Sequence, residues 1–285
     1  MPRSDLALES AQDIEPQQLP PEEFSKQTVC RGRVTITYIH IKGEKAADAV
    51  GKPCGRYITV QLPPLSEATA DLARMAQSIA LPLRQLLPCQ GTVLVVGLGN
   101  EAITPDALGP QSVRRVLATR HIRGEYARAA GLADLRPVVT VESGVLGKTG
   151  MESGEMVRAV VGAIKPCAVI AVDALAARSI ERLGSTVQIG DSGIVPGSGI
   201  GNSRKALDRQ TLGVPVIAVG VPTVVDAATL VEDLTGQPSD ADRQMMVTPR
   251  EVDLMVHQAS LLVAMSINAA LQPHYAAAEL TDMAL

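Results

Sequence analysis

Aromatic residues are nearly absent from this chain of 285 residues, which has no tryptophan, one phenylalanine and four tyrosines. Proteins that bind single-stranded nucleic acid stack the bases on aromatic side chains, and many ligand pockets are walled with such side chains. The formal net charge is −4, so the chain also lacks the basic surface that a nucleic-acid backbone requires. The composition therefore argues against nucleic acid as a direct partner and against a pocket lined with aromatic rings.

Cysteine pairs, targeting segments and long apolar runs are lacking as well. The four cysteines are far apart in the sequence, so there is no Cys-x-x-Cys zinc or redox pair, and their scatter suits a reducing cytosol. The first residues, MPRSDLALES, have no apolar core behind a basic start. No uninterrupted apolar run approaches the roughly eighteen residues of a membrane helix. We therefore expect a cytoplasmic protein with no membrane partner.

The residues that are present predict a compact protein with an acidic N-terminal segment. Apolar residues make up 46% of the chain and charged residues 20%. Residues 1–28 contain six acidic and two basic side chains, and thus account for the whole net charge of −4. We expect three parts: this acidic segment at 1–28, an N-terminal extension at 29–90, and an α/β domain at 91–285 that ends in a long helix.

After residue 91, short continuous apolar runs alternate with stretches of helical periodicity. Strands are predicted at 92–98, 138–141, 168–172, 186–189 and 215–221, and helices at 105–118, 152–164, 175–183, 224–234 and 248–271. In the extension, strands are predicted at 33–41 and 57–62 and a helix at 66–83. Apolar strands that alternate with helices are typical of a sheet covered on both faces. The expected fold is therefore α/β, with three layers in which a twisted, mainly parallel sheet lies between helices.

Two aspartates follow predicted strands of this sheet. Asp106 comes a short loop after the run 92–98, and Asp173 directly follows the run 168–172. Ligands of open α/β sheets bind at the carboxyl ends of the strands, so both positions are candidates for catalysis. Each also has a plain structural explanation, Asp106 as an acid in a first helical turn and Asp173 as an acceptor for nearby backbone amides.

If the two carboxyls lie together, burial and their like charges push their pKa values apart, as in other acid–base pairs. A helix terminus favours ionised Asp106, whereas burial favours protonated Asp173. We therefore assign Asp106 as the base and Asp173 as the acid, and the exchanged assignment stays open.

Other motifs give weaker indications. Gly97, Gly99 and Ala102 are spaced like the dinucleotide fingerprint, which makes a nucleotide-binding oxidoreductase an alternative function. That reading lacks the ribose-binding acid about twenty residues further on. Asp226 is better explained as the capping acid of the helix that follows it. No Gly-x-Ser-x-Gly motif follows an apolar strand, and the histidines are scattered.

Five blocks of the sequence resemble the germination protease family, whose members degrade small acid-soluble spore proteins. The blocks are GLGNEAITPDALGP (97–110), VIAVDALAARSIERL (169–183), GIVPGSGIGN (193–202), GVPVIAVGVPTVVDA (213–227) and MVTPREVD (246–253). They occur in the family's order between about residues 91 and 270. The N-terminal RSDLALE (3–9) is similar to the family's autoprocessing site.

This resemblance implies an endopeptidase made as an inactive zymogen in the developing spore, in the cytoplasm of the forespore or spore core. It implies a homotetramer, a fold similar to hydrogenase maturation endopeptidases, and small acid-soluble spore proteins as substrates. By motif, the family's essential aspartates correspond to Asp106 and Asp173. The processing bond would be Asp5–Leu6, which makes 1–5 a very short propeptide that resembles substrate and can occupy the cleft.

The substrate-binding residues expected alongside this pair come from three groups. Glycine-rich backbone is expected to bind extended substrate or an oxyanion, and an acidic residue before the cut calls for a cation. Asp191, in the glycine-rich stretch 188–205, would orient that loop or touch substrate. The expected residues are Gly97, Gly99, Asn100, Gly197, Gly199 and Asp191, with Arg178 and Lys148 as the candidate cations.

The mechanistic class is open from the sequence. No third metal ligand is evident beside the two aspartates, so we expect a carboxylate pair without a cofactor, with a divalent metal at Asp106 and Asp173 as the alternative. A metal-dependent endopeptidase like those of hydrogenase maturation is thus a second hypothesis. A non-catalytic spore structural protein is a third.

Overall fold

The structure is a computed structural model that describes residues 4–12, 14, 19–65, 72–88, 90–197, 205–237, 245–275 and 280. Its strands are β1 (Phe24–Arg31), β2 (Val34–Ile41), β3 (Gly55–Gln61), β4 (Val93–Gly97), β5 (Val138–Glu142), β6 (Ala168–Ala177), β7 (Thr186–Gly190), β8 (Val216–Asp226) and β9 (Met246–Val247). Its α-helices are α1 (Ala7–Ser10), α2 (Glu44–Val50), α3 (Leu72–Leu86), α4 (Leu108–Val113), α5 (Gly124–Ala129), α6 (Leu146–Thr149), α7 (Ser153–Ile164), α8 (Arg209–Leu212), α9 (Ala227–Thr235) and α10 (Val252–Leu271). Two 3-10 turns, η2 (Thr104–Asp106) and η3 (Ile180–Arg182), complete the described elements.

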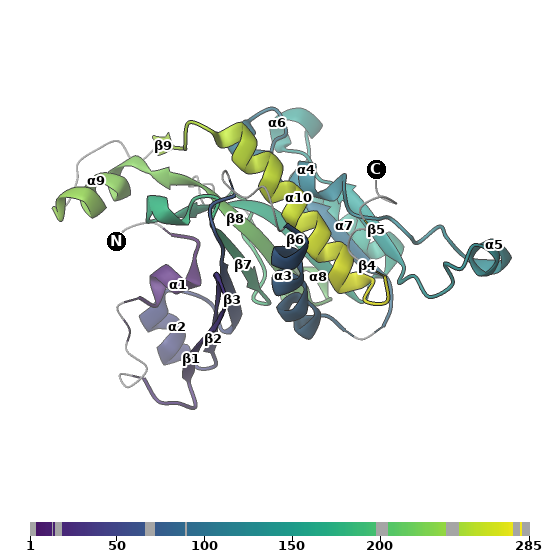
Figure 1. Ribbon diagram of the computed structural model, residues 1–285, viewed down its shortest axis with the longest axis horizontal. Coiled ribbons are helices and arrows are strands. Elements are labelled where there is room, and N and C mark those ends of the chain that lie inside the picture. Colours follow the sequence, from purple (N-terminus) through teal and green to yellow (C-terminus); the bar gives the residue numbers. More distant parts are fainter. Residues whose placement is uncertain are drawn as a thin grey trace.

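One continuous sheet organises these elements, with the strand order β1-β2-β3-β7-β8-β6-β4-β5 and β9 beside β8. Strands β5, β4, β6 and β8 pair in parallel, as expected for apolar strands linked by helices. The extension strands β1, β2 and β3 join this sheet through antiparallel pairing of β3 with β7, and β7 in turn pairs antiparallel with β8. The extension is thus part of the same sheet as the parallel strands (Figure 1).

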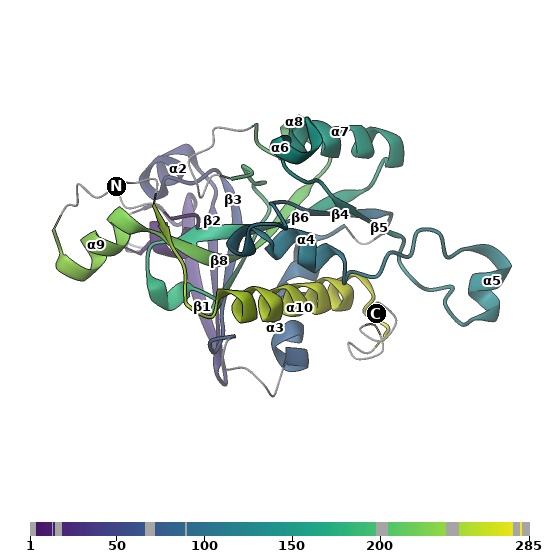
Figure 2. The same cartoon turned by 90° about the horizontal axis from the view of Figure 1, so that it is seen from above.

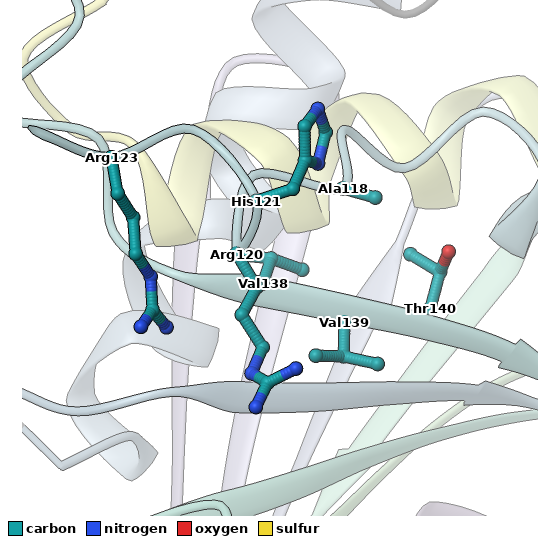
Figure 3. Close-up of a pocket in the computed structure, with 7 residues that line it drawn as sticks. All are labelled: Ala118, Arg120, His121, Arg123, Val138, Val139 and Thr140. Atoms are coloured by element: carbon teal, nitrogen blue, oxygen red, sulfur yellow. The ribbon is translucent and has the colours of Figure 1, made fainter. Parts of the chain in front are cut away.

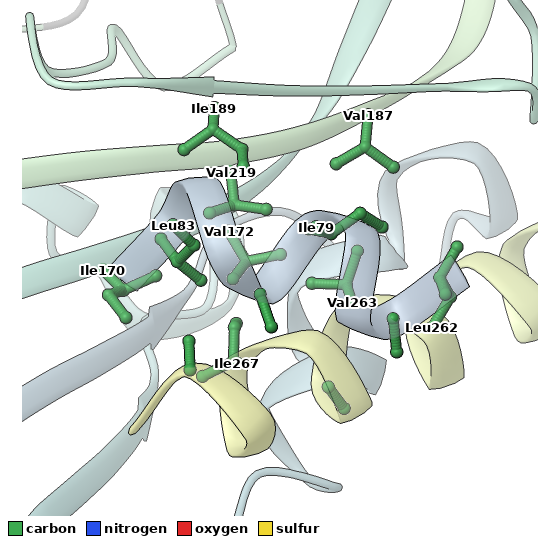
Figure 4. Packing of buried hydrophobic residues seen from close by; sticks show 14 of the residues in the cluster. Ile79, Leu83, Ile170, Val172, Val187, Ile189, Val219, Leu262, Val263 and Ile267 are labelled. Atoms are coloured by element: carbon green, nitrogen blue, oxygen red, sulfur yellow. The ribbon is translucent and has the colours of Figure 1, made fainter. Parts of the chain in front are cut away.

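Helices cover both faces of the parallel strands, which confirms the predicted three-layer α/β class. Figure 2 shows α3 and α10 on one side of the sheet and α6, α7 and α8 on the other. On the first side, α3 and α10 pack on each other and on the sheet in the largest buried cluster, which includes Ile79, Val172, Val219 and Val263 (Figure 4). On the other side, Val157 of α7 lies in a second cluster with residues of β4 and β6.

Helix α10 is the one helix in the described part of the chain that is long and apolar enough to cross a membrane. It is a core helix here, because its residues Leu262, Val263 and Ile267 are almost fully buried against the sheet and α3. Its apolar stripe was predicted, whereas its first turn begins at Val252, after Pro249. The length and the apolar character of α10 are therefore explained by its burial within the protein.

Two predicted helices differ in the structure. The helix expected at 175–183 is wrong, because β6 continues to Ala177 and pairs with β8 past a register shift at Leu175 and Ala176. Burial of Leu175 and Ala177 against the N-terminal Leu6 outweighs their helical propensity. The helix expected at 105–118 is divided into the turn η2 and the short helix α4, so Asp106 ends a 3-10 turn.

Gly109 allows α4 to lie directly on the strand ends. A Cβ atom at this position would overlap the carbonyl oxygens of Leu98 and Val172, so the backbone of α4 touches the backbone after β4 and within β6. A Cβ atom on Gly97 would likewise overlap the carbonyl oxygen of Gly109, so the backbones of these two glycines are also in contact. These contacts fix where the loop that carries Asp106 leaves β4.

We expect Gly109→Ala to lower the free energy of unfolding by about 1–3 kcal/mol, because the added methyl group can be accommodated only by moving backbone. Gly162→Ala in α7 is the matched control. Its Cβ would meet nothing within 4 Å, and alanine is the better helix former by about 0.5–1 kcal/mol. Urea unfolding measures both, and equal effects of the two substitutions would contradict the close packing.

Candidate active site

Asp173 lies on β6 at the carboxyl end of the parallel strands, with 4% of its surface exposed. Its Oδ1 accepts a hydrogen bond from the backbone N–H of Ala174 at 3.0 Å. Burial raises the pKa of Asp173 well above its ordinary value of 3.8, and the nearby carboxylate of Asp106 raises it further. The backbone N–H groups of Ala174 and Gly197 lower this pKa in part. The Asp173 carboxyl therefore keeps its proton to a higher pH than an exposed aspartate does.

Asp106 reaches the same place from the loop after β4. Asn100 donates its backbone N–H to Asp106 Oδ2 at 2.7 Å, and Gly99 passes so close to Asp106 that a Cβ there would overlap the Asp106 carbonyl oxygen. Gly99 has φ 106°, which glycine adopts most readily. Thr223 Oγ1 donates to the carbonyl of Pro105 at 2.7 Å and thereby ties the turn to β8. The ends of β4, β6 and β8 thus position the pair.

The two carboxyls occupy different environments, as an acid–base pair requires. Asp106 is half-buried and accepts from a backbone amide, whereas Asp173 is buried and its pKa is raised. A water between them would meet an ionised acceptor on one side and a proton donor on the other. The predicted assignment of Asp106 as base and Asp173 as acid agrees with the direction of the Asp173 shift, and the roles themselves stay a prediction.

The N-terminal segment lies against this pair. Asp5 donates its backbone N–H to Ala176 O at 2.9 Å, and Ala176 donates back to Asp5 Oδ2 at 2.8 Å. Leu6 is fully buried in a cluster with Leu175, Ala177 and Val225. Asp5 is thus bound on β6 three residues from Asp173, and its charge adds to the raised pKa of Asp173.

Further contacts anchor the residues that follow. Gln188 on β7 accepts from the Ala7 N–H through Oε1 at 2.6 Å and donates to the Asp5 carbonyl through Nε2 at 2.9 Å. The buried Glu9 carboxylate accepts the backbone N–H groups of Arg178 at 2.8 Å and Ser179 at 3.0 Å. Residues 5–9 are therefore bound in sequence along the ends of β6 and β7.

A cleft with a volume of about 600 Å³ continues from this segment. Asp5, Lys52 and Gln188 line one part of it, and the glycine-rich stretch and α8 line another. A second pocket of about 380 Å³, lined by Arg120, His121, Arg123 and the beginning of β5, holds no carboxylate in its lining (Figure 3). The first cleft adjoins the bound N-terminal segment, and Leu175 of β6 is among its lining residues, whereas Asp106 and Asp173 are not. We take the carboxyl pair together with the neighbouring cleft as the candidate active site.

The glycine-rich backbone near the pair supports the aspartates. Gly97 accepts from the Ser143 N–H through its carbonyl, Gly99 and Asn100 wrap the Asp106 carboxylate, and the N–H of Gly197 bonds to Asp173. Gly199 lies outside the described residues. In the loop after β4, the Asp106 carboxylate thus occupies the position where a dinucleotide fingerprint would bind a pyrophosphate.

The predicted charged residues occupy several places. Asp191 lines the cleft and binds Arg56 through both oxygens, at 2.6 Å to its N–H and 2.7 Å to its Nε. Arg178 pairs with Asp233 through Nε at 2.8 Å and contacts the N-terminal segment through its backbone. Lys148 is exposed on α6. Asp226 caps α9 by accepting the Thr229 N–H, which confirms its structural explanation.

Lys52 and Gln188 were missed by the sequence reasoning, although both touch the Asp5 carbonyl. Lys52 follows a helix in the extension, and Gln188 is an isolated polar residue in an apolar strand. The polar glutamine within the run 186–189 was the one available signal, because a half-buried amide inside a strand needs a partner.

Comparison with known proteins gives consistent matches. A sequence model of the germination protease family matches residues 3–236. The germination protease of Caldanaerobacter subterraneus subsp. tengcongensis is 38% identical, with 99% of this chain and 97% of the relative covered. That of Clostridium tetani is 37% identical, with 99% and 98% covered. Among solved structures, the [NiFe] hydrogenase maturation protease HycI of Thermococcus kodakarensis KOD1 matches with a TM-score of 0.38 and 16% identity, over 65% of this chain and 98% of that chain.

The raised pKa of Asp173 has a measurable effect on stability. A carboxyl whose pKa rises on folding takes up a proton when the chain folds. Its contribution is fully present below the ordinary value of 3.8 and is lost as the pH rises through the raised value of the folded state. We therefore expect the free energy of unfolding of the wild type to fall with rising pH relative to that of Asp173→Asn.

Urea unfolding of both proteins at a series of pH values from mild acid to neutrality measures this difference. Asp233→Asn, which changes an exposed aspartate, is the control. Parallel curves for the wild type and Asp173→Asn would contradict a proton retained on Asp173.

Proposed function

The chain belongs to the germination protease family and is thus an endopeptidase of spores, and we propose that it begins the degradation of small acid-soluble spore proteins and is made as a zymogen that cleaves its own Asp5–Leu6 bond. The observation that carries the proposal is the binding of Asp5 on β6, three residues from Asp173, whose pKa the charge of Asp5 raises. Asp5 and Leu6 precede the short helix α1, and Leu6 is fully buried. The residues on both sides of the proposed cut are thus held by specific contacts, as those of a bound substrate would be.

The proposed reaction uses the two carboxyls in turn. Asp106 takes a proton from water as the water oxygen bonds to the Asp5 carbonyl carbon, and the C=O electron pair moves onto oxygen. The tetrahedral intermediate then re-forms the C=O bond, the bond to the Leu6 nitrogen breaks, and Asp173 gives that nitrogen its proton. The proton on Asp106 returns to Asp173, which restores the pair for the next substrate.

The contacts of the N-terminal segment define the sequence that the cleft accepts. The acidic side chain before the cut meets the N–H of Ala176, and the apolar side chain after it fills the pocket of Leu175, Ala177 and Val225. The glutamate three residues beyond Leu6 meets two backbone amides, so its recognition needs no basic side chain. Substrates of the form acidic–Leu–Ala–x–Glu would bind in the same way.

The same contacts explain latency. Spore-protein substrate has to occupy the site that residues 5–9 fill, and a segment of the same chain competes at high local concentration. The propeptide 1–5 is short, but its last residue, Asp5, is held by hydrogen bonds of its backbone and its side chain. Inhibition therefore depends on the residues around the processing bond, and hardly on the length of the propeptide.

We further propose that the enzyme works in the spore core as a homotetramer. The exposed apolar residues Val231 and Leu234 on α9 and Met245 after it provide apolar surface of the kind that subunit contacts cover. This assembly rests on the family resemblance.

The carboxyl pair is proposed to act without a metal. In the part of the chain that the structure describes, no three His, Cys, Asp or Glu side chains come together as a ligand set. These donors do not fit a centre with three protein ligands and a water.

Removal of divalent metal is therefore expected to leave self-cleavage unchanged. The rate of loss of residues 1–5 is measured by intact-protein mass spectrometry after dialysis against EDTA, and after zinc or manganese is added back. Loss of cleavage on chelation with recovery on metal addition would establish the metal-dependent alternative.

The central test compares the wild type with Asp106→Asn and Asp173→Asn. We expect the wild type to lose residues 1–5, and each variant to do so at least about 10²-fold more slowly, because each lacks one proton-transfer group. Mass spectrometry over time gives the rates. The same proteins are then incubated with a recombinant small acid-soluble spore protein, and the cut is mapped by peptide mass.

Asp233→Asn is again the control, since it changes an aspartate outside the cleft. Equal trimming of all four proteins would indicate a contaminating protease and would contradict the roles of both aspartates. Trimming of the wild type without any cleavage of the spore protein would retain the zymogen and refute the proposed substrate.

A further inference from the structure

We propose that Lys52 and Gln188 bind the carbonyl oxygen of the bond to be cut and stabilise the oxyanion that forms on it. The inference deepens the proposed function and rests on cleavage at Asp5–Leu6. Its basis is that two side chains from separate elements converge on one backbone oxygen, that of Asp5. A carbonyl at the candidate cleavage point thus has a cationic donor and an amide donor.

Lys52 reaches this oxygen from the extension. Helix α2 ends at Gly51, whose φ of 69° turns the chain so that Lys52 points back to the sheet, with its own N–H bonded to Ala47 O at 3.2 Å. Lys52 Nζ donates to Asp5 O at 3.1 Å and to Ser4 O at 3.0 Å. The ammonium therefore lies over the last peptide groups before the cut.

The surroundings of Lys52 suit this role. The side chain lines the cleft and is half-buried, and burial lowers its pKa while the charges of Asp5 and Glu9 raise it. Partial removal from water strengthens the attraction between a cation and a developing negative charge. A half-buried lysine is also costly to keep, which is consistent with a function at this position.

Gln188 approaches from the sheet and contacts both sides of Leu6. Its Nε2 donates to the carbonyl of Asp5 at 2.9 Å, and its Oε1 accepts the N–H of Ala7 at 2.6 Å. The side-chain amide thus pairs with the substrate backbone as a neighbouring strand would. The Asp5–Leu6 peptide group is held between these two bonds.

The register of the sheet puts Gln188 on the same face as Asp173. Gln188 on β7 pairs with Gly220 on β8, and Gly220 pairs with Asp173 on β6, so the three residues form one row across the sheet. Residues in one row point to the same face. Leu175 covers Gly220 between them, and Leu6 packs in one cluster with Leu175.

In the proposed step, the C=O electron pair of Asp5 moves onto oxygen as water attacks the carbon, and the negative charge develops beside Lys52 Nζ and Gln188 Nε2. The donors are already 3.1 Å and 2.9 Å from this oxygen. Donors at such distances are in the range found in oxyanion holes. The proton transfers remain with Asp106 and Asp173, so Lys52 neither gains nor loses a proton in the step.

The test measures self-cleavage of the full chain, in which the bond is already bound, so that the first-order rate constant reports the chemical step. We expect Lys52→Met to lower this rate constant by about 10²–10³-fold, as removal of one oxyanion donor does. Gln188→Leu is expected to lower it at least about tenfold. Lys52→Arg, which keeps a cation, should recover part of the rate. Lys42→Met, an exposed lysine of the same extension, is the matched control.

A second readout separates donation from docking. Hydrogen exchange of the Asp5 amide, which bonds to Ala176 O, reports whether the segment remains bound. The inference predicts slow cleavage with the Asp5 amide still protected in Lys52→Met. Slow cleavage with loss of that protection would instead assign Lys52 a docking role and overturn the oxyanion role. If Lys52→Met does not fold, as judged by circular dichroism, Gln188→Leu decides by the same two measurements.

The outcomes also separate this inference from the proposed function. Wild-type cleavage at Asp5–Leu6 with unchanged rates in Lys52→Met and Gln188→Leu would overturn the inference and leave the zymogen proposal intact. A wild type that is not cut at Asp5–Leu6, while it does cleave an added spore protein, would overturn self-cleavage and the inference that rests on it.

Discussion

Burial of the Asp173 carboxyl is the constraint on which the site depends. A carboxylate placed at 4% exposure beside a second carboxylate is costly, and the raised pKa of Asp173 and the N–H groups of Ala174 and Gly197 reduce that cost. A raised pKa is what the proposed role of Asp173 as proton donor requires. Asp106, at the half-buried end of its turn, provides the contrasting environment. The difference in burial therefore gives Asp173 and Asp106 different electrostatic environments.

The extension contributes to the site through the continuity of the sheet. Strand β3 pairs with β7, and β7 with β8, so the turn after α2 lies near the ends of the parallel strands. The extension thereby supplies Lys52 to the cleft and the surface of β2 and β3 on which α1 packs. The candidate catalytic carboxyls and the proposed substrate contacts thus come from parts of the chain that are far apart in sequence.

Periodicity and apolar runs predicted most of the strands, because a short continuous apolar run is typical of a buried parallel strand. The strand expected at 138–141 is observed as Val138–Glu142, and that at 186–189 as Thr186–Gly190. The two aspartates were found from their positions after strands. The extension of β6 through Ala177 was missed because its stabilising contacts come from Leu6, which local sequence does not reveal.

The contributions of Lys52 and Gln188 were not predictable for the same reason. Each depends on a long-range pairing: Lys52 on the antiparallel addition of β3, and Gln188 on its register with Gly220 and Asp173. A slip of one residue would turn Gln188 to the other face of the sheet. Sequence patterns give the period of a strand but not its register with distant partners. The backbone recognition of Glu9 is likewise invisible in side-chain composition, because amides of any residue type could provide it.

The position of the cut within segment 4–9 has a kinetic consequence. The proposed hydrolysis of the Asp5–Leu6 bond would release what precedes it, but the pocket for Leu6, the Gln188 contact to Ala7 and the amides that hold Glu9 all lie on the side that stays attached. The new N-terminus would therefore be a tethered product, present at an effective concentration in the millimolar range. Activation by this route would have two stages, scission and undocking, of which the second is reversible. Such an enzyme would show a lag before full activity, and the length of the lag would depend on how fast the new N-terminus leaves the cleft. Added substrate competes with the N-terminus for the cleft and would shorten the lag.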